Sequence, residues 1–309
     1  MIWVKVRLRA RWQKETKVSQ SKKNRAMTYK TILAYMQTPE AAVTVLDVTV
    51  PLAKEHGAHL IGLHTKPFVE PYEVYGTLAA EIPPSVYAQR QEDIDRDAAE
   101  VRKVFDVATA DSAATVEWRE GECLRSGFAS TVVEHGKIAD LIIAAQTTAN
   151  KGFDPWLSVT AQLVMEAGRP VLLVPTSGRF KTVGRRPMIT WNETRESARA
   201  AFDTIPLLTH AANAQILSVD EGAMRLDKAP LPGEGLAVCL ARHDIKCTVQ
   251  PVTVQNLGVG EEILRRADYD GVDLLVMGCF GRSRLREYVF GGVTEHVMRN
   301  MNVPVLTSH

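Results

Sequence analysis

The sequence lacks a long apolar run, a motif of paired cysteines and a clear excess of either charge. No stretch reaches the roughly 18 consecutive apolar residues that a membrane-spanning helix needs, so a soluble protein is predicted. The four cysteines form no CxxC pair and no cluster with metal-ligand spacing, which favours free thiols in a reducing cytoplasm. Hydrophobic residues at 45% suffice for a globular core. The formal net charge of +1 indicates neither nucleic acid nor an anionic membrane as a partner.

The first 25 residues depart from this balance, with nine Lys or Arg against the single acid Glu15. Without them the remaining chain has a formal charge near −7. The segment has no apolar stretch of about 7–15 residues before a small-residue cleavage site, which excludes a secretory signal. A basic nucleic-acid arm and a targeting peptide are alternatives. We favour a disordered extension over residues 1–26, arising from an upstream start codon, because Met27 immediately precedes the first convincing strand.

Short apolar runs alternate with long amphipathic stretches along the rest of the chain. The runs are continuously apolar, which is typical of parallel strands covered by helices on both faces. In the first half they are ILAYM (32–36), LIGL (60–63), LIIAA (141–145) and VLLV (171–174). Between them, residues 94–108 place Ile94, Ala98, Val101, Phe105 and Ala108 on one helical face. This alternation predicts βαβ units and a mainly parallel sheet.

The same order of strands then begins again. The repeated runs are MITW (188–191), AQILSV (214–219), CTVQPV (247–252), DLLVMG (273–278) and VPVL (303–306). ADLIIAAQ (139–146) resembles VDLLVMGC (272–279), and GRPVLLVP (168–175) resembles NVPVLTSH (302–309). This is a duplication of a whole domain. We therefore predict two α/β domains, residues 27–177 and 186–309, joined by the linker 176–187.

A glycine-rich stretch follows the fourth strand of the second half: GCFGRSRLREYVFGG (278–292). Glycines let a backbone approach a ligand closely, and the free N–H groups of a helix start attract an anion. Arginines in the stretch, such as Arg282, could bond phosphate oxygens. The stretch is neither a Walker A loop nor GxGxxG. Its chemistry nevertheless suits a phosphate.

The spacing Gly278-x2-Gly281-x9-Gly291, after an apolar strand and before a helix and a VPVL strand, resembles the signature of the universal stress protein family. The resemblance covers nearly everything after Met27 and points to a tandem, two-domain member. It implies five-stranded parallel sheets of order 3-2-1-4-5, of the adenine nucleotide alpha hydrolase-like type. It also implies that the two domains pair through VLLV (171–174) and VPVL (303–306).

In nucleotide-binding members the resemblance places ATP, with Mg, between strands 1 and 4. Here Gly278, Gly281, Arg282, Gly291 and Gly292 would surround phosphates. Asn192 would lie by the ribose or phosphate, and Val219 would line the adenine pocket.

Two departures from the family pattern matter. The Ser/Thr that follows the last motif glycine is Gly292 here, and Thr294 either replaces its hydroxyl or begins helix packing. A VDGS-like turn after strand 1 is WNET (191–194), so Asn192 stands where an Asp falls. Thr194 matches the Ser of that turn, or else it caps the following helix.

The first domain departs further, because TTANKGFDPWLSVTAQ (147–162) lacks the motif glycines apart from Gly152, which is out of register. We interpret it as a structural half without its own nucleotide. No catalytic set is evident, and no metal site: Asp93, Asp95 and Asp97 mimic a calcium loop whose required Gly is Ala98. His59 and His64 fall on opposite faces of a strand. His296, on the helix after the motif, reaches the site or lies on the surface.

With these patterns, the resemblance implies a cytoplasmic stress-response binding or regulatory module rather than a committed enzyme. Its adenine-nucleotide site would lie in the C-terminal domain alone. The alternatives are a structural, protein-interacting member that binds no nucleotide, and a slow ATP hydrolase. A homodimer of two chains is left open.

Overall fold

The structure is a computed structural model of the chain. It describes residues 28–68, 84–112, 114–123, 127–146, 159–220, 231–254, 257–279 and 292–309. The N-terminal half contains β1 (Thr31–Tyr35), α2 (Pro39–His56), β2 (His59–Pro67), α3 (Pro84–Thr109), β3 (Val116–Cys123), α4 (Phe128–Gly136), β4 (Leu141–Ala145), α5 (Val159–Glu166) and β5 (Val171–Val174). The C-terminal half contains β6 (Pro187–Thr190), α6 (Arg195–Asp203), α7 (Ile205–Leu208), β7 (Ala214–Asp220), α8 (Glu234–Ala241), β8 (Cys247–Thr253), α9 (Val259–Tyr269), β9 (Leu274–Gly278), α10 (Gly292–Asn300) and β10 (Val305–Ser308).

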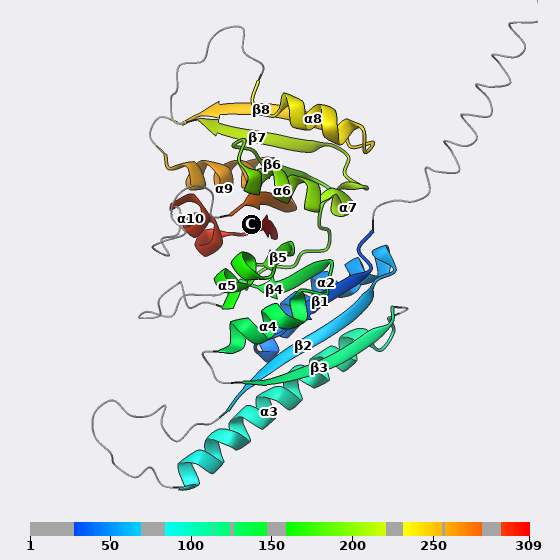
Figure 1. Cartoon of the computed structure of the whole chain (residues 1–309), viewed down its shortest axis with the longest axis vertical. Helices are drawn as coiled ribbons and strands as arrows, with labels where there is room; N and C mark the ends of the chain where they lie inside the picture. The colour runs from blue at the N-terminus through cyan, green and yellow to red at the C-terminus, as the bar shows by residue number, and fades with distance from the viewer. Residues whose placement is uncertain are drawn as a thin grey trace, which may run out of the picture.

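The described strands form one ten-stranded sheet in the order β3-β2-β1-β4-β5-β10-β9-β6-β7-β8 (Figure 1). Counted within each half, this is the predicted order 3-2-1-4-5. All neighbours inside a half are parallel. The predicted α/β fold class is therefore confirmed.

The two halves meet at the centre of the sheet, where β5 and β10 pair antiparallel (Figure 1). Val305 lies opposite Leu173, and Leu306 lies opposite Leu172. These are the two strands that the sequence analysis pairs, although β10 begins two residues later than the run VPVL. Pro304 has no N–H to give to a ladder, which accounts for the later start.

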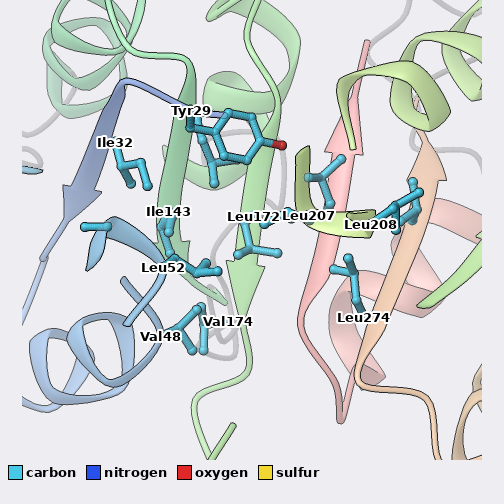
Figure 2. Close-up of a cluster of buried hydrophobic side chains, with 14 of the residues drawn as sticks. Tyr29, Ile32, Val48, Leu52, Ile143, Leu172, Val174, Leu207, Leu208 and Leu274 are labelled. Carbon is cyan, nitrogen blue, oxygen red and sulfur yellow. The ribbon is translucent and has the colours of Figure 1, made fainter. Parts of the chain in front are cut away.

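Each face of the sheet carries one hydrophobic cluster, and both clusters run across the meeting point of the halves. In the first cluster, Leu172 and Val174 of β5 gather with Leu207, Leu208 and Leu274 of the other half (Figure 2). Helices α2, α3, α6, α7 and α8 cover this face, and α4, α5, α9 and α10 cover the opposite face. Because neither core ends at the linker, the division into domains 27–177 and 186–309 stays a prediction.

One detail of the duplication is repeated in both halves at the amino edge of the sheet. Asp140, just before β4, accepts hydrogen bonds from the backbone N–H groups of Lys30 (2.6 Å) and Thr31 (3.0 Å). Asp273, just before β9, accepts them from Arg185 (3.1 Å) and Arg186 (2.8 Å). The aligned sequences ADLIIAAQ and VDLLVMGC thus share a structural function for their aspartate, which fastens strand 4 of each half to the start of strand 1.

Two expectations need correction. The helical stripe of α3 ends on Thr109, which is buried, whereas Ala108 is exposed. Strand β3 was not among the apolar runs, because this outermost strand is VEWREGEC and buries only Gly121 fully. An edge strand with charged side chains does not show the continuous apolar pattern of a central strand.

Candidate functional site

The candidate site lies where the strand order of the C-terminal half reverses. β6 pairs on one side with β7 and on the other with β9, with Met188 opposite Leu275. After β6 the chain enters α6 on one face of the sheet, and after β9 it reaches α10 on the other face. In open α/β sheets, the carboxyl edge at such a reversal is where ligands bind.

The turn between β6 and α6 is closed by its own side chains. Thr194 is the N-cap of α6, and its hydroxyl accepts a hydrogen bond from the backbone N–H of Ser197 (3.3 Å). The same hydroxyl donates to Oδ1 of the exposed Asn192 (2.9 Å). Of the two roles considered for Thr194, the structure places it in the capping one. Asn192 itself is exposed at the edge of the sheet.

Glu193, between these two residues, has a backbone φ of 60°. This left-handed conformation is costly for a residue with a β carbon, and glutamate has no short polar side chain to offset it. It stands where the VDGS-like turn has its glycine. The turn geometry is therefore kept although the glycine is not.

Gly278, the last residue of β9, has a packing function that the glycine spacing alone does not reveal. A β carbon at this position would overlap the backbone nitrogen of Ser197 and the carbonyl carbon of Glu196, in the first turn of α6. The absence of a side chain lets α6 approach the end of β9 directly. The amino terminus of α6 thus lies at the carboxyl edge of the sheet.

Glu196 is a buried carboxylate in that first turn, with 5% of its surface exposed. Burial raises the pKa of the Glu196 carboxyl, but hydrogen bonds from Arg195, its own backbone N–H and Thr194 outweigh this effect. The resulting pKa lies below the usual value, so the group is ionised at neutral pH. The helix start therefore already has an anion beside its N–H groups.

Sequence reasoning missed Glu196, although a signal was present. The first half begins α2 with Thr38-Pro39-Glu40, and the second begins α6 with Thr194-Arg195-Glu196. Thr38 caps α2 by accepting a hydrogen bond from the N–H of Ala41 (3.2 Å). The repeated Thr-x-Glu was the detectable sign of two equivalent helix starts.

Helix α10 brings a second amino terminus to the end of β9. Its first residue, Gly292, is exposed, and a β carbon there would meet no atom within 4 Å. Thr294 is 6% exposed and lies beside the thiol of Cys279, the residue after β9. Burial raises the pKa of the Cys279 thiol to about 12, against the opposing effect of the hydroxyls of Thr307 and Thr294. Thr294 is thus part of the packing under α10.

Val219 lies near the end of β7, where it is half-buried and packs on the second hydrophobic cluster. Thr190 is paired with Leu217, so Val219 and Asn192 are each two residues further toward the carboxyl edge. The structure thus brings Asn192, Thr194, Val219, Gly278 and Gly292 to one edge. Gly281, Arg282 and Gly291 lie outside the described residues.

The other residues considered for chemistry have structural partners. Asp95 forms an ion pair with Lys66 (2.9 Å), and Asp93 pairs with Arg96 (2.9 Å). His59 contacts Glu117 (2.9 Å) and His64 contacts the carbonyl of Met36 (2.7 Å). His296 packs against Gly260 of α9. Over the described ranges no group of three His, Cys, Asp or Glu could hold a metal ion, and no helix is long and apolar enough to cross a membrane.

A family model described as the Universal stress protein family matches residues 198–309, which run from within α6 to β10 and include β9 and the start of α10. Residues 198–309 are thus similar to the universal stress protein family. The match covers the C-terminal half, and the sequence resemblance stated above is confirmed there.

Two curated universal stress proteins are similar to the chain over short segments. One from Methanocaldococcus jannaschii is 46% identical over 46 residues, covering 15% of this chain and 28% of the relative. One from Synechocystis sp. is 31% identical over 101 residues, covering 25% and 35%. The chain therefore spans about a third or less of the curated relatives that it matches.

The fold of the whole chain is similar to the crystal structure of a universal stress protein from Archaeoglobus fulgidus. The TM-score is 0.65 at 16% identity, over 90% of this chain and 95% of that chain. Such low identity shows the fold alone. Two universal stress protein structures were determined in complex with cAMP and with dAMP, but at TM-scores of 0.34 and 0.28 they say nothing about the site of this chain.

Proposed function

We propose that this chain is a universal stress protein, a cytoplasmic stress-response binding or regulatory module that holds an adenine nucleotide, ATP with Mg, at the carboxyl edge of its C-terminal half. The observation that carries the proposal is the convergence of the amino termini of α6 and α10 on the end of β9. Both helix starts bring positive dipole ends to this edge of the sheet, where an anion is favoured.

The charges at this edge support a metal-bound nucleotide over a free polyphosphate. Glu193 is exposed in the turn before α6, and the ionised Glu196 lies within its first turn. Both carboxylates repel bare phosphate oxygens, whereas Mg would neutralise part of the phosphate charge. Gly278, Gly281, Arg282, Gly291 and Gly292 remain the proposed phosphate neighbours, with Asn192 by the ribose or phosphate and Val219 by the adenine.

Isothermal calorimetry of the full chain with ATP and Mg tests the proposal, with Gly292→Ser as the informative variant. The hydroxyl would enter open space and replace the one that the family signature has at this position. A single added hydrogen bond contributes about 0.5–1.5 kcal/mol, so the dissociation constant should fall by roughly 2- to 10-fold. No heat from either protein, while circular dichroism shows an intact fold, would reject the nucleotide.

A second candidate is a member that binds no nucleotide and acts through protein contacts. It is favoured by the start of α6, where the side chains of Thr194 and Glu196 already accept hydrogen bonds from backbone N–H groups that a phosphate would use. Nucleotide that copurifies with the chain would argue against it. Slow ATP hydrolysis is the third reading, and turnover that is lost in Gly281→Val would support it.

A further inference from the structure

The carboxyl end of α10 is capped by a residue of the other half. Nε2 of Gln146, which directly follows β4, donates hydrogen bonds to the backbone carbonyls of Met298 (2.8 Å) and Arg299 (3.1 Å). Both partners are carbonyl oxygens, so the amide nitrogen of Gln146 must face them. Its Oε1 accepts a hydrogen bond from the N–H of Thr176 (3.4 Å), and its own N–H donates to the carbonyl of Val174 (2.7 Å).

This cap matters because the last four carbonyls of a helix have no partner within the helix. Gln146 satisfies two of them, while the side chain of Asn300 donates to the carbonyl of His296 one turn earlier (2.8 Å). The side chain of Gln146 is in turn held by the hydrogen bond from Thr176, two residues after the end of β5. The amide thus connects the sheet of the N-terminal half to the end of α10.

Helix α10 has nine residues, which makes it about 13 Å long. At one end is the Gln146 contact, and at the other is Gly292, at the edge where β9 ends. A helix this short moves as one body, so fixing its last turn restricts its first turn. We propose that Gln146 is a positioning residue through which the N-terminal half holds α10 in place at the carboxyl edge of the C-terminal half. The consequence for ligand affinity rests on the proposed function, but the positioning of α10 does not.

A matched contact exists on the other side of the centre. Nη2 of Arg199 in α6 donates to the carbonyl of Gly168 (2.7 Å), two residues after α5 ends. The N-terminal half therefore contacts the end of α10, which precedes β10, and the C-terminal half contacts the segment after α5, which precedes β5. In the described part of the chain Arg199 bonds to Gly168 and Asp203 and not to α10, so it serves as a control for general loosening between the halves.

Hydrogen exchange of the full chain, without ligand, tests the positioning. In Gln146→Leu, amides of residues 292–300 should exchange about 3- to 10-fold faster, corresponding to the loss of about one net hydrogen bond. Gln146→Lys should restore protection, because an ammonium group donates to the same carbonyls and suits a helix end. Arg199→Leu should speed exchange around residues 159–168 and leave α10 unchanged. Should Gln146→Leu fail to fold, Gln146→Asn, one carbon shorter, takes its place.

Unchanged exchange of α10 in Gln146→Leu overturns the proposal, as does failure of Gln146→Lys to restore it. Equal loosening of α10 in Arg199→Leu also overturns it, because the effect would then belong to the whole interface. ATP and Mg are then titrated into the same variants. If the natural sequence binds ATP, Gln146→Leu should weaken binding several-fold, and equal affinity rejects the link to the site. If no variant binds ATP, the proposed function fails while the exchange result still decides the positioning.

Discussion

Gly278 at the end of β9 lies directly against Ser197 in the first turn of α6, with no room for a β carbon between the two backbones. The family signature places this glycine at a phosphate, yet the described contacts give it a reason that needs no ligand. Gly292, at the other end of the glycine-rich stretch, has open space around it. A side chain is therefore excluded at Gly278 and tolerated at Gly292, and substitutions at the two positions should have different effects on stability.

Gly278→Ala should destabilise the fold by about 2 kcal/mol, since the overlap is with backbone atoms that cannot rotate away. Gly292→Ala is the matched control and should be neutral or slightly stabilising, because alanine favours a helix over glycine by about 1 kcal/mol. Urea unfolding followed by circular dichroism measures both. Equal stability of Gly278→Ala and the natural sequence would mean that α6 does not approach β9 as closely as the structure has it.

Glu193→Gly should stabilise the chain. The left-handed conformation costs a residue with a β carbon about 1–2 kcal/mol, while glycine loses about 0.5–1 kcal/mol through its freer unfolded state. The net gain should be about 0.5–1 kcal/mol in urea unfolding. Asp244, three residues after α8 and with φ of 63°, gives the control Asp244→Gly, for which a smaller gain is expected because aspartate has a short polar side chain that tolerates this conformation. A loss of stability in Glu193→Gly would show that its side chain makes a stabilising contact.

The fold followed from the sequence because its signals are local and repeated. The continuous apolar runs LIIAA and VLLV coincide with β4 and β5, and the duplication placed their counterparts in the second half. Edge strands were harder, since β3 is half-exposed and carries no such run. The pairing of β5 with β10 came from the family resemblance, because nothing in either strand alone indicates its partner, and its antiparallel direction was not predicted.

The candidate site was predictable only as far as residue spacing reaches. Asn192, Thr194 and Gly278 were located from their places after two strands, and the structure brings them to one edge. The overlap that requires Gly278 to be glycine depends on how closely a helix from elsewhere approaches, which spacing does not encode. The cap from Gln146 to Met298 spans 152 residues and joins the two halves, so no local pattern announces it.

Glu262 in α9 should make the stability of the chain fall in acid. Two side-chain hydrogen bonds from Arg265 and one from Arg266 hold its pKa at about 2, although burial acts in the other direction. The carboxylate's contribution is present above its ordinary pKa of about 4.5 and is lost as the pH falls from there toward 2.

Glu262→Gln should therefore lower the free energy of unfolding by about 2 kcal/mol at pH 7, with a difference that shrinks as the pH is lowered below 4.5. The exposed neighbour gives the control Glu261→Gln, which should change stability by less than about 0.5 kcal/mol. Urea unfolding at pH 7, 5 and 4 measures both variants. A constant difference across this range would show that the pKa of Glu262 is not depressed.

Cys279 should be the slowest of the four thiols to react, and its reaction should report on α10. It is fully buried, with a pKa of about 12, whereas Cys123, Cys239 and Cys247 are partly exposed. At pH 8 only about one thiol in ten thousand would be ionised at such a pKa, and the reagent also needs an opening to reach it. A thiol reagent should label Cys279 at least about 100-fold more slowly than the others, as followed by mass spectrometry, with Cys279→Ala assigning the slow site.

Since Thr294 of α10 lies beside this thiol, Gln146→Leu should accelerate its labelling and Arg199→Leu should not. Labelling of Cys279 as fast as Cys239 would contradict the packing of α10 on the end of β9.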